Sequence, residues 1–257
     1  MAKYRENGLV VAQERIATDT YSIWIEAKQI AAEATAGQFV NMVTGDGSKI
    51  LPRPISICGI DKEKGVLRIV YHVTGKGTGT EIFSKKTAGD EIIVMGPMGT
   101  GFPTERTEDA ILIGGGIGIA PMLQLAKDLN ANKQIVLGYR DELFLNEEFE
   151  PYGTVSVATD SGSAGTKGNV IDAIRENQIK GDVIYACGPT PMLRAVKAYA
   201  EENGILCYIS LEQRMACGIG ACLACVCQSK EIDEHSQVHN KRVCKEGPVF
   251  LSTEVEL

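Results

Sequence analysis

Residues 110–130 read AILIGGGIGIAPMLQLAKDLN, an apolar strand followed by a glycine-rich turn and then by a helical pattern. The same alternation continues towards the C-terminus. We expect further strands at 134–139, 154–158 and 182–186, and helices at 121–130, 170–177 and 191–203. Strands that alternate with helices predict a parallel α/β sheet, because the connecting helices cover the faces of the sheet.

Two loops of this region would lie at the carboxyl ends of the strands, where ligands bind to such sheets. The first contains Gly115, Gly116 and Gly118, and the second is Cys187-Gly188-Pro189. A glycine loop before a helix lets a pyrophosphate approach unpaired backbone N–H groups, which predicts a nucleotide ligand. However, Ile119 replaces the last glycine of the strict G-x-G-x-x-G pattern, so a packing role for this turn is an equal alternative.

The choice between NAD and NADP stays open. An acidic residue after the second strand would indicate NAD, but Arg140, Asp141 and Glu142 lie together at that place.

The first hundred residues contain short β-like segments separated by Gly, Pro, Asp or Thr. The expected strands are 9–15, 21–26, 38–43, 55–60, 66–73 and 91–95, and six strands at this spacing predict a small antiparallel barrel. Only residues 78–86 have a helical pattern here, and residues 96–105 read as the linker out of the barrel.

Two features of this barrel have the chemistry to bind a second nucleotide. In Arg53-Pro54-Ile55-Ser56, the guanidinium can bind a phosphate and the serine can hydrogen-bond a flavin ring nitrogen. In GKGTGT, residues 75–80, the amides of Gly77 and Thr78 precede a helix and can hold a pyrophosphate. A strand-edge proline and an ordinary helix N-cap explain either feature equally well when it is taken alone.

Four cysteines near the C-terminus, Cys217, Cys222, Cys225 and Cys244, have the C-x4-C-x2-C and distant C spacing of plant-type [2Fe–2S] ferredoxins. Cys227 lies close enough to compete with Cys225, but the two-residue interval favours Cys225. A zinc site at Cys222, Cys225, His235 and His239 is an alternative, although both histidines are more typical of surface residues. Disulfides fit poorly with an N-terminus that lacks the apolar core of a signal peptide.

The length and charge limit the remaining possibilities. A chain of 257 residues predicts two domains and a small cluster-binding segment. The net charge of -7 offers no basic surface for nucleic acid or anionic lipid. The apolar run 110–123 is too short and too rich in glycine to span a membrane. Because the N-terminus also lacks the apolar core of a signal peptide, we expect a cytoplasmic protein.

The chain resembles the ferredoxin–NADP reductase superfamily over nearly its full length. RPIS at 53–56 and GKGTGT at 75–80 are similar to its flavin motifs, and GGGIGIAPM at 114–122 and CGPTPM at 187–192 to its pyridine-nucleotide loops. The resemblance implies an FAD-binding barrel at 1–104, an NAD-binding α/β domain at 105–210 and a [2Fe–2S] segment at 211–257. It also adds Val70, Tyr71 and His72 to the flavin site. Ile55 replaces the flavin-stacking tyrosine of many members, so we expect Tyr71 or aliphatic side chains to cover the ring.

The C-terminal stretches EQRMACGIGACLACVCQ, 212–228, and VCKEGPVF, 243–250, resemble the electron-transfer subunits of NAD-dependent dihydroorotate dehydrogenases. This resemblance implies an electron relay through [2Fe–2S] and FAD to NAD+ in pyrimidine (UMP) biosynthesis. It also implies an FMN-containing catalytic partner, two copies of each subunit, and no catalytic acid or base on this chain.

Three other functions remain open. Related subunits of ferredoxin-dependent transhydrogenases and sulfide dehydrogenases share much of this layout, and a stand-alone NAD(P)H–ferredoxin reductase would also fit. A zinc- and nucleotide-binding redox regulator is the non-enzymatic alternative.

Overall fold

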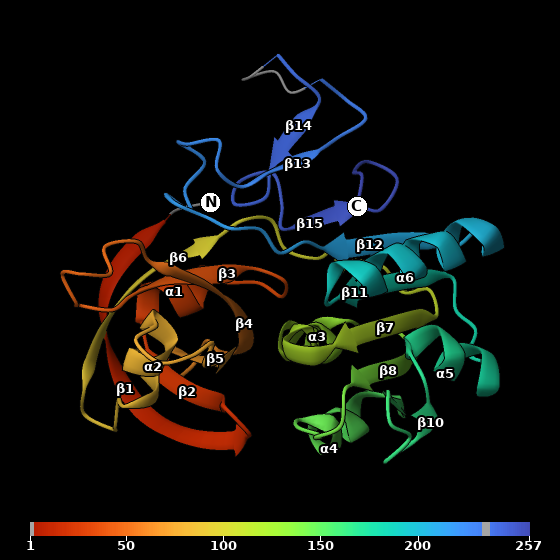
Figure 1. Ribbon diagram of the computed structural model, residues 1–257, viewed down its shortest axis with the longest axis horizontal. Helices are drawn as coiled ribbons and strands as arrows, with labels where there is room; N and C mark the ends of the chain where they lie inside the picture. The colour runs from red at the N-terminus through yellow and green to blue at the C-terminus, as the bar shows by residue number, and fades with distance from the viewer. Residues whose placement is uncertain (1–2, 233–236) are drawn as a thin grey trace.

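The computed structural model describes residues 3–232 and 237–257 and contains a barrel and an open sheet side by side, with a smaller part above them (Figure 1). The barrel is closed, all its strand pairs are antiparallel, and its strand order is β1-β2-β5-β4-β3-β6. Its strands are β1 (Tyr4–Ala17), β2 (Thr20–Glu26), β3 (Phe39–Val43), β4 (Arg53–Asp61), β5 (Val66–His72) and β6 (Glu91–Met98). The six strands expected from the sequence are confirmed.

Two expectations for the barrel were wrong. Residues 78–86 are not the only helical part, because α1 (Lys28–Glu33) lies between β2 and β3 and buries Ile30 and Ala31. The helix α1 begins after Ala27, which provides no capping side chain, so its start has no signal in the sequence. The expected linker 96–105 begins too early, because β6 continues through Met98. The expected helix is α2 (Gly79–Ser84), capped by Thr78.

The open sheet has the order β10-β9-β8-β7-β11-β12-β15, and all its pairs are parallel except β12 with β15. Its strands are β7 (Ala110–Gly115), β8 (Lys133–Tyr139), β9 (Thr154–Thr159), β10 (Thr166–Lys167), β11 (Val183–Cys187), β12 (Leu206–Ser210) and β15 (Val249–Leu251). The helices are α3 (Ile119–Asp128), α4 (Asn146–Phe149), α5 (Val170–Glu176) and α6 (Thr190–Asn203), with 3-10 turns at Gly116–Gly118 and Glu150–Tyr152.

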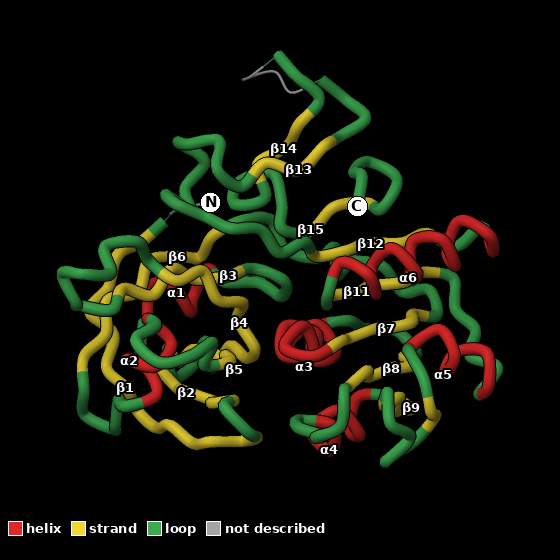
Figure 2. Tube along the Cα trace, in the orientation of Figure 1, coloured by secondary structure: helices red, strands yellow, loops and turns green. Residues whose placement is uncertain are grey.

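Both faces of this sheet are covered by helices, as Figure 2 shows. Leu112 of β7 packs in one apolar core with α3 and α4, whereas its neighbours Ile111 and Ile113 pack in another core with α5 and α6. Successive side chains of a strand point to opposite faces, which explains the continuous apolar run of β7. The predicted α/β domain is therefore confirmed.

The C-terminal part leaves the sheet after β12, forms the hairpin β13 (Val226–Gln228) and β14 (Asn240–Arg242), and returns to the sheet as β15. It packs on the outer wall of the barrel as well as on the sheet, since Phe39 and Met98 share one apolar core with Cys225, Cys244 and Phe250. Neither β12 nor β15 was expected from the sequence. The domain boundaries near residues 104 and 210 stay a prediction.

Barrel and sheet are joined by direct contacts. Arg68 of β5 forms a bidentate ion pair with Glu148 of α4, with N–O distances of 2.5 and 2.9 Å. The backbone N–H of Ile60 donates to the Gln124 side chain of α3 at 2.7 Å.

Across residues 3–232 and 237–257, no helix has the length and apolarity needed to cross a membrane.

Candidate functional site

A pocket of about 900 Å³ lies between the barrel, the carboxyl ends of the sheet strands and the segment that leads to the cysteines. Twelve of the fifteen residues predicted to bind cofactors line it: Arg53, Pro54, Ile55, Ser56, Val70, Tyr71, His72, Gly115, Gly118, Cys187, Gly188 and Pro189. Gly77, Thr78 and Gly116 are not among its lining residues. The structure thus brings the barrel motif and both sheet loops to one cavity, and the individual roles of these residues stay predictions.

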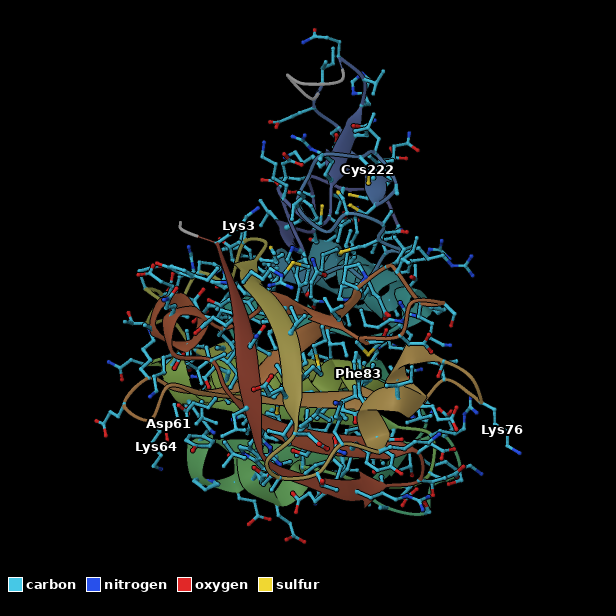
Figure 3. All side chains as sticks on the ribbon, turned by 90° about the vertical axis from the view of Figure 1, so that its left-hand side faces the viewer. Lys3, Asp61, Lys64, Lys76, Phe83 and Cys222 are labelled. Atoms are coloured by element: carbon cyan, nitrogen blue, oxygen red, sulfur yellow. The ribbon has the colours of Figure 1, made fainter. Side chains whose placement is uncertain are left out.

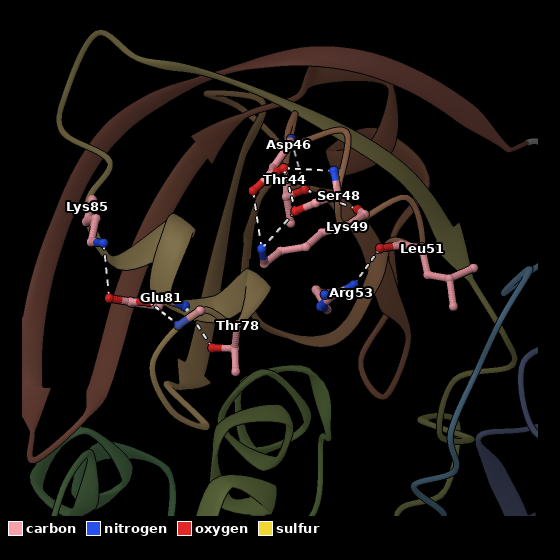
Figure 4. Close-up of polar contacts among 10 residues, drawn as sticks. Thr44, Asp46, Ser48, Lys49, Leu51, Arg53, Thr78, Glu81 and Lys85 are labelled. Carbon is pink, nitrogen blue, oxygen red and sulfur yellow. Dashed lines mark hydrogen bonds and ion pairs between the residues drawn. The ribbon is translucent and has the colours of Figure 1, made fainter.

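The barrel side of the pocket combines a cation with a helix start. Arg53 Nη1 donates to the Leu51 carbonyl at 2.5 Å, and its guanidinium lies over α2, where a Cβ atom on Gly79 would be 2.5 Å from Arg53 Nε (Figure 4). The N–H of Gly77 donates to the Glu81 carboxylate at 2.5 Å. This N–H and the Lys85 ammonium lower the pKa of Glu81. In this structure the N–H of Gly77 is therefore bonded within the loop, and the phosphate site expected at Gly77 and Thr78 stays a prediction.

Tyr71 borders the pocket, but its ring is buried in the barrel core. It stacks on Tyr21, with ring centroids 5.9 Å apart, and meets the edge of Phe83. Its hydroxyl donates to Gln13 at 2.8 Å, and burial raises the pKa of this phenol. Ile55 also lines the pocket, and the covering of a flavin ring by Tyr71 or by aliphatic side chains stays a prediction.

The two sheet loops touch each other closely. A Cβ atom on Gly118 would lie 2.5 Å from the Cys187 carbonyl oxygen, so only glycine fits between the loops. Gly116 has a positive φ of +54° and open space around it. Burial raises the pKa of the Cys187 thiol to about 12, against the hydrogen bond with Ser210. These features fit backbone recognition of a nucleotide, and the protonated thiol of Cys187 is unsuited to acid–base work near neutral pH.

The sequence prediction missed one wall of the pocket, the connecting segment after β12. Its lining residues are Ser210, Leu211, Glu212, Gln213, Arg214 and Met215. The available signal was topological: a segment that follows the carboxyl end of a parallel strand lies at the ligand-binding edge. Without β12 in the prediction, that signal did not appear.

The four predicted cysteines form two neighbouring pairs at the top of the molecule, where Figure 3 labels Cys222. The sulfur atoms of Cys217 and Cys222 are 3.3 Å apart, and the thiols of Cys225 and Cys244 lie against each other. Within the described residues, no three His, Cys, Asp or Glu side chains are arranged to hold a single metal ion. Two pairs of thiols fit a centre with two irons and two cysteines on each iron.

Backbone N–H groups of the loop between Cys217 and Cys222 already point at sulfur. Gly220 N donates to Cys244 Sγ at 3.1 Å, and Cys222 N to Cys217 Sγ at 3.3 Å. Burial alone would raise the pKa of Cys217, but N–H groups of this loop outweigh it and lower that pKa to about 6. The pKa of Cys244 is raised to about 12, mainly by burial and secondly by the contact with Cys225. The loop therefore favours a thiolate at Cys217, as an iron ligand requires.

The competing assignments receive less support. Cys227 is directed to the Lys241 carbonyl at 3.5 Å, across the hairpin from its own strand. His239 Nδ1 lies 3.0 Å from the Lys230 carbonyl oxygen, and the residue is exposed. His235 lies outside the described residues.

Comparison with known proteins gives matches over nearly the whole chain. The iron–sulfur cluster binding domain of dihydroorotate dehydrogenase B matches residues 212–256, and the oxidoreductase NAD-binding domain matches residues 112–198. The electron transfer subunit of dihydroorotate dehydrogenase B (NAD(+)) from Fusobacterium nucleatum subsp. nucleatum is 43% identical over 98% of both chains. The subunit of the same name from Bacillus caldolyticus is 42% identical over 98% of this chain and 99% of its own.

Solved structures agree with this picture. A structure of an NADH-dependent reduced ferredoxin–NADP oxidoreductase superposes with a TM-score of 0.87 at 32% identity, over 98% of this chain and 90% of the other. The ferredoxin reductase of carbazole 1,9a-dioxygenase has a TM-score of 0.65 at 18% identity, over 80% of this chain and 67% of its own, which shows a shared fold.

Proposed function

This chain belongs to the family of electron transfer subunits of dihydroorotate dehydrogenase B (NAD(+)), and on that premise we propose that it relays electrons from a partner dihydroorotate-oxidising subunit to NAD+. The partner would carry FMN, and the reaction would serve pyrimidine formation. The matched domains and the reductase fold support FAD, a [2Fe–2S] cluster and NAD as the groups involved.

One observation carries the proposal: a single pocket is lined by the flavin motif of the barrel, by both nucleotide loops of the sheet and by the segment that leads to the cysteines. Two nucleotides bound from opposite walls of this pocket would meet in it. When bound, a flavin supplies the conversion between two-electron and one-electron transfer that nicotinamide lacks, and an iron–sulfur cluster supplies one-electron transfer.

The residues of the chain then position and shield these groups. Arg53 and the loop that ends at Thr78 would hold phosphates, and Ser56 would hydrogen-bond a ring nitrogen. The loops at Gly118 and Cys187 would bind the pyridine nucleotide through their backbone. Cys217, Cys222, Cys225 and Cys244 would hold the cluster, which the two thiol pairs support. No proton transfer by a side chain is required, so we assign no catalytic acid or base.

The partner and the place of action belong to the same proposal. The relatives are named as subunits, which supports a catalytic partner for this chain. We propose a heterotetramer with two copies of each subunit, in the cytoplasm. Masses of the purified complex under non-denaturing conditions test this stoichiometry.

The first experiment is an anaerobic visible spectrum of the purified chain with assays of iron, acid-labile sulfide and released flavin. We expect about two irons, two sulfides and one FAD per chain. Zinc without flavin would contradict the proposal and favour a regulator instead.

The second experiment separates the enzymatic alternatives. We expect dihydroorotate-dependent reduction of NAD+ only when the chain is mixed with an FMN-containing dihydroorotate dehydrogenase subunit. Full turnover by the chain alone would refute the need for a partner. Rapid reduction of added ferredoxin by NADH or NADPH without another subunit would instead place the chain with stand-alone reductases.

A further inference from the structure

Asn41 is a fully buried polar residue whose side chain has no hydrogen-bond partner among the described residues. Its exposed fraction is 0%, and neither Oδ1 nor Nδ2 is bonded. Burying an amide without partners is unfavourable, because the group loses its hydrogen bonds to water, so such a group needs an explanation in the complete protein. The residue stands in the strand sequence FVNMV, where asparagine is otherwise disfavoured.

The side chain of Asn41 points out of the barrel towards the cysteines. Its neighbours Val40 and Met42 pack in the barrel core, whereas Phe39 packs with Cys225 and Cys244. Because side chains alternate along a strand, Asn41 shares the outer face with Phe39. A Cβ atom on Gly218 would overlap Asn41 Nδ2, so the amide lies directly against the loop between Cys217 and Cys222.

The other side of this loop is already held. Arg242 Nη1 donates to the Gly220 carbonyl at 3.0 Å, and Arg242 also pairs with Glu246. Backbone N–H groups of the loop are used on the sulfurs of Cys217 and Cys244. Asn41 therefore contacts the loop from the barrel wall, and the N–H donors of its side-chain amide are not used by any other described residue.

We propose that Asn41 Nδ2 donates a hydrogen bond to a sulfur atom of the iron–sulfur cluster, either a thiolate or an inorganic sulfide, and so raises the reduction potential of that cluster. This inference rests on the proposed function, since it requires the cluster. A hydrogen bond to sulfur stabilises the reduced form more than the oxidised form, because the reduced form carries one more negative charge.

The position of β3 makes this contact informative. Asn41 is paired with Pro54 of the flavin motif on one side and with Met95 of β6 on the other. Pro54 lines the cofactor pocket. Strand β3 thus lies between the pocket wall and the cysteine loop. Asn41 sets the electrostatic environment of that loop.

The test is an anaerobic potentiometric titration of the full-length chain, followed by electron paramagnetic resonance of the reduced cluster. In Asn41→Leu, which keeps the branching and the number of side-chain heavy atoms and removes the donors, we expect the equilibrium constant for one-electron reduction to fall about tenfold, which is about 59 mV. Asn41→Asp, which replaces the donors with a negative charge, should lower the potential further. A potential unchanged in Asn41→Leu with iron content intact would overturn the inference.

Two controls complete the experiment. Gln124→Leu removes another buried amide, one that is bonded to Ile60 and Asp128, and should leave the cluster potential unchanged. If the Asn41 variants lose iron, the test is made on the wild-type protein labelled with 15N-asparagine. Pulsed electron paramagnetic resonance should then detect a side-chain nitrogen coupled to the cluster. Absence of this coupling would refute the contact. Wild-type protein without iron would instead refute the proposed function.

Discussion

Cys225 and Cys227 are only two residues apart, yet their side chains have different surroundings. The Cys225 thiol lies against the Cys244 thiol, whereas the Cys227 thiol donates to the Lys241 carbonyl within the β13–β14 hairpin.

We therefore expect Cys225→Ser to lose the cluster and Cys227→Ser to retain it. Iron and acid-labile sulfide per chain, together with the visible spectrum, measure the outcome. The two serine variants are matched in chemistry and differ only in position. Retention of two irons in Cys225→Ser and loss in Cys227→Ser would reverse our ligand assignment.

At the scale of residues, the sequence predicted best where a motif has fixed spacing. The four cysteines and the flavin and nucleotide loops are recognisable because their chemistry requires particular residues at particular intervals. The burial of the Tyr71 ring was not predictable, since alternation in a strand does not say which face of a closed barrel is the interior. Asn41 was missed because its significance depends on Gly218, which is distant in sequence.

At the scale of elements, the close packing of the two nucleotide loops gives a sharp prediction. In Gly118→Ala, the new methyl group would meet the Cys187 carbonyl at 2.5 Å, a backbone atom that cannot move aside easily. We expect a loss of about 1–3 kcal/mol in unfolding free energy and weaker binding of NAD(H). Denaturant unfolding and equilibrium binding measure the two effects.

Gly116→Asn is the matched control for stability, because asparagine tolerates the positive φ of this residue and the space around it is open. It should cost less than Gly118→Ala. Equal stability of wild type and Gly118→Ala would show that the loops separate more readily than their packing implies.

The C-terminal end of α3 contains an unfavourable charge at Asp128. Burial raises its pKa above the ordinary 3.8, against the hydrogen bond from Gln124. The folded protein thus binds this proton more tightly than the unfolded chain, so stability falls as pH rises through the raised pKa. A carboxylate at a helix C-terminus is also repelled by the helix dipole.

We expect Asp128→Asn, which keeps an acceptor for Gln124, to stabilise the protein by about 0.5 kcal/mol at pH 7, since the residue is partly exposed and screened. The gain should shrink as the pH falls through the raised pKa of Asp128, where the wild-type carboxylate becomes protonated. Denaturant unfolding at several pH values checks this, and a gain independent of pH would contradict the electrostatic cause.

The elements themselves were predicted unevenly, for physical reasons. Long apolar or periodic segments such as β7 and α6 were identified, because burial dictates their composition. The helix α1 was missed because no capping side chain marks its start, unlike α2 with Thr78, and β15 because three residues are too few to show a period. Strand β15 also depends on pairing with β12 for its existence.

At the scale of the whole molecule, strand β15 near the C-terminus stabilises one edge of the α/β sheet. Phe250 of β15 is buried in the core that contains α5 and α6, and β15 protects the edge of β12. A chain that ends at Pro248 should lose several kcal/mol of stability, from burial of apolar side chains and from strand pairing.

A chain that ends at Ser252, which keeps β15, is the control and should unfold closer to wild type. The midpoint of thermal unfolding, followed by circular dichroism, compares the two. If both truncations unfold at the same temperature, β15 contributes little and the residues after it account for the loss.

The return of the chain to its own sheet has a consequence for how such proteins arise. Ser210 and Val249 are paired neighbours, and Leu211 N donates to the Pro248 carbonyl at 2.8 Å. The cysteine segment therefore begins and ends at one point, as an insertion into a β-hairpin would. A gene could gain, lose or exchange this segment as a cassette without shifting the register of any other strand, which separates the evolution of the electron-carrying module from that of the nucleotide-binding scaffold.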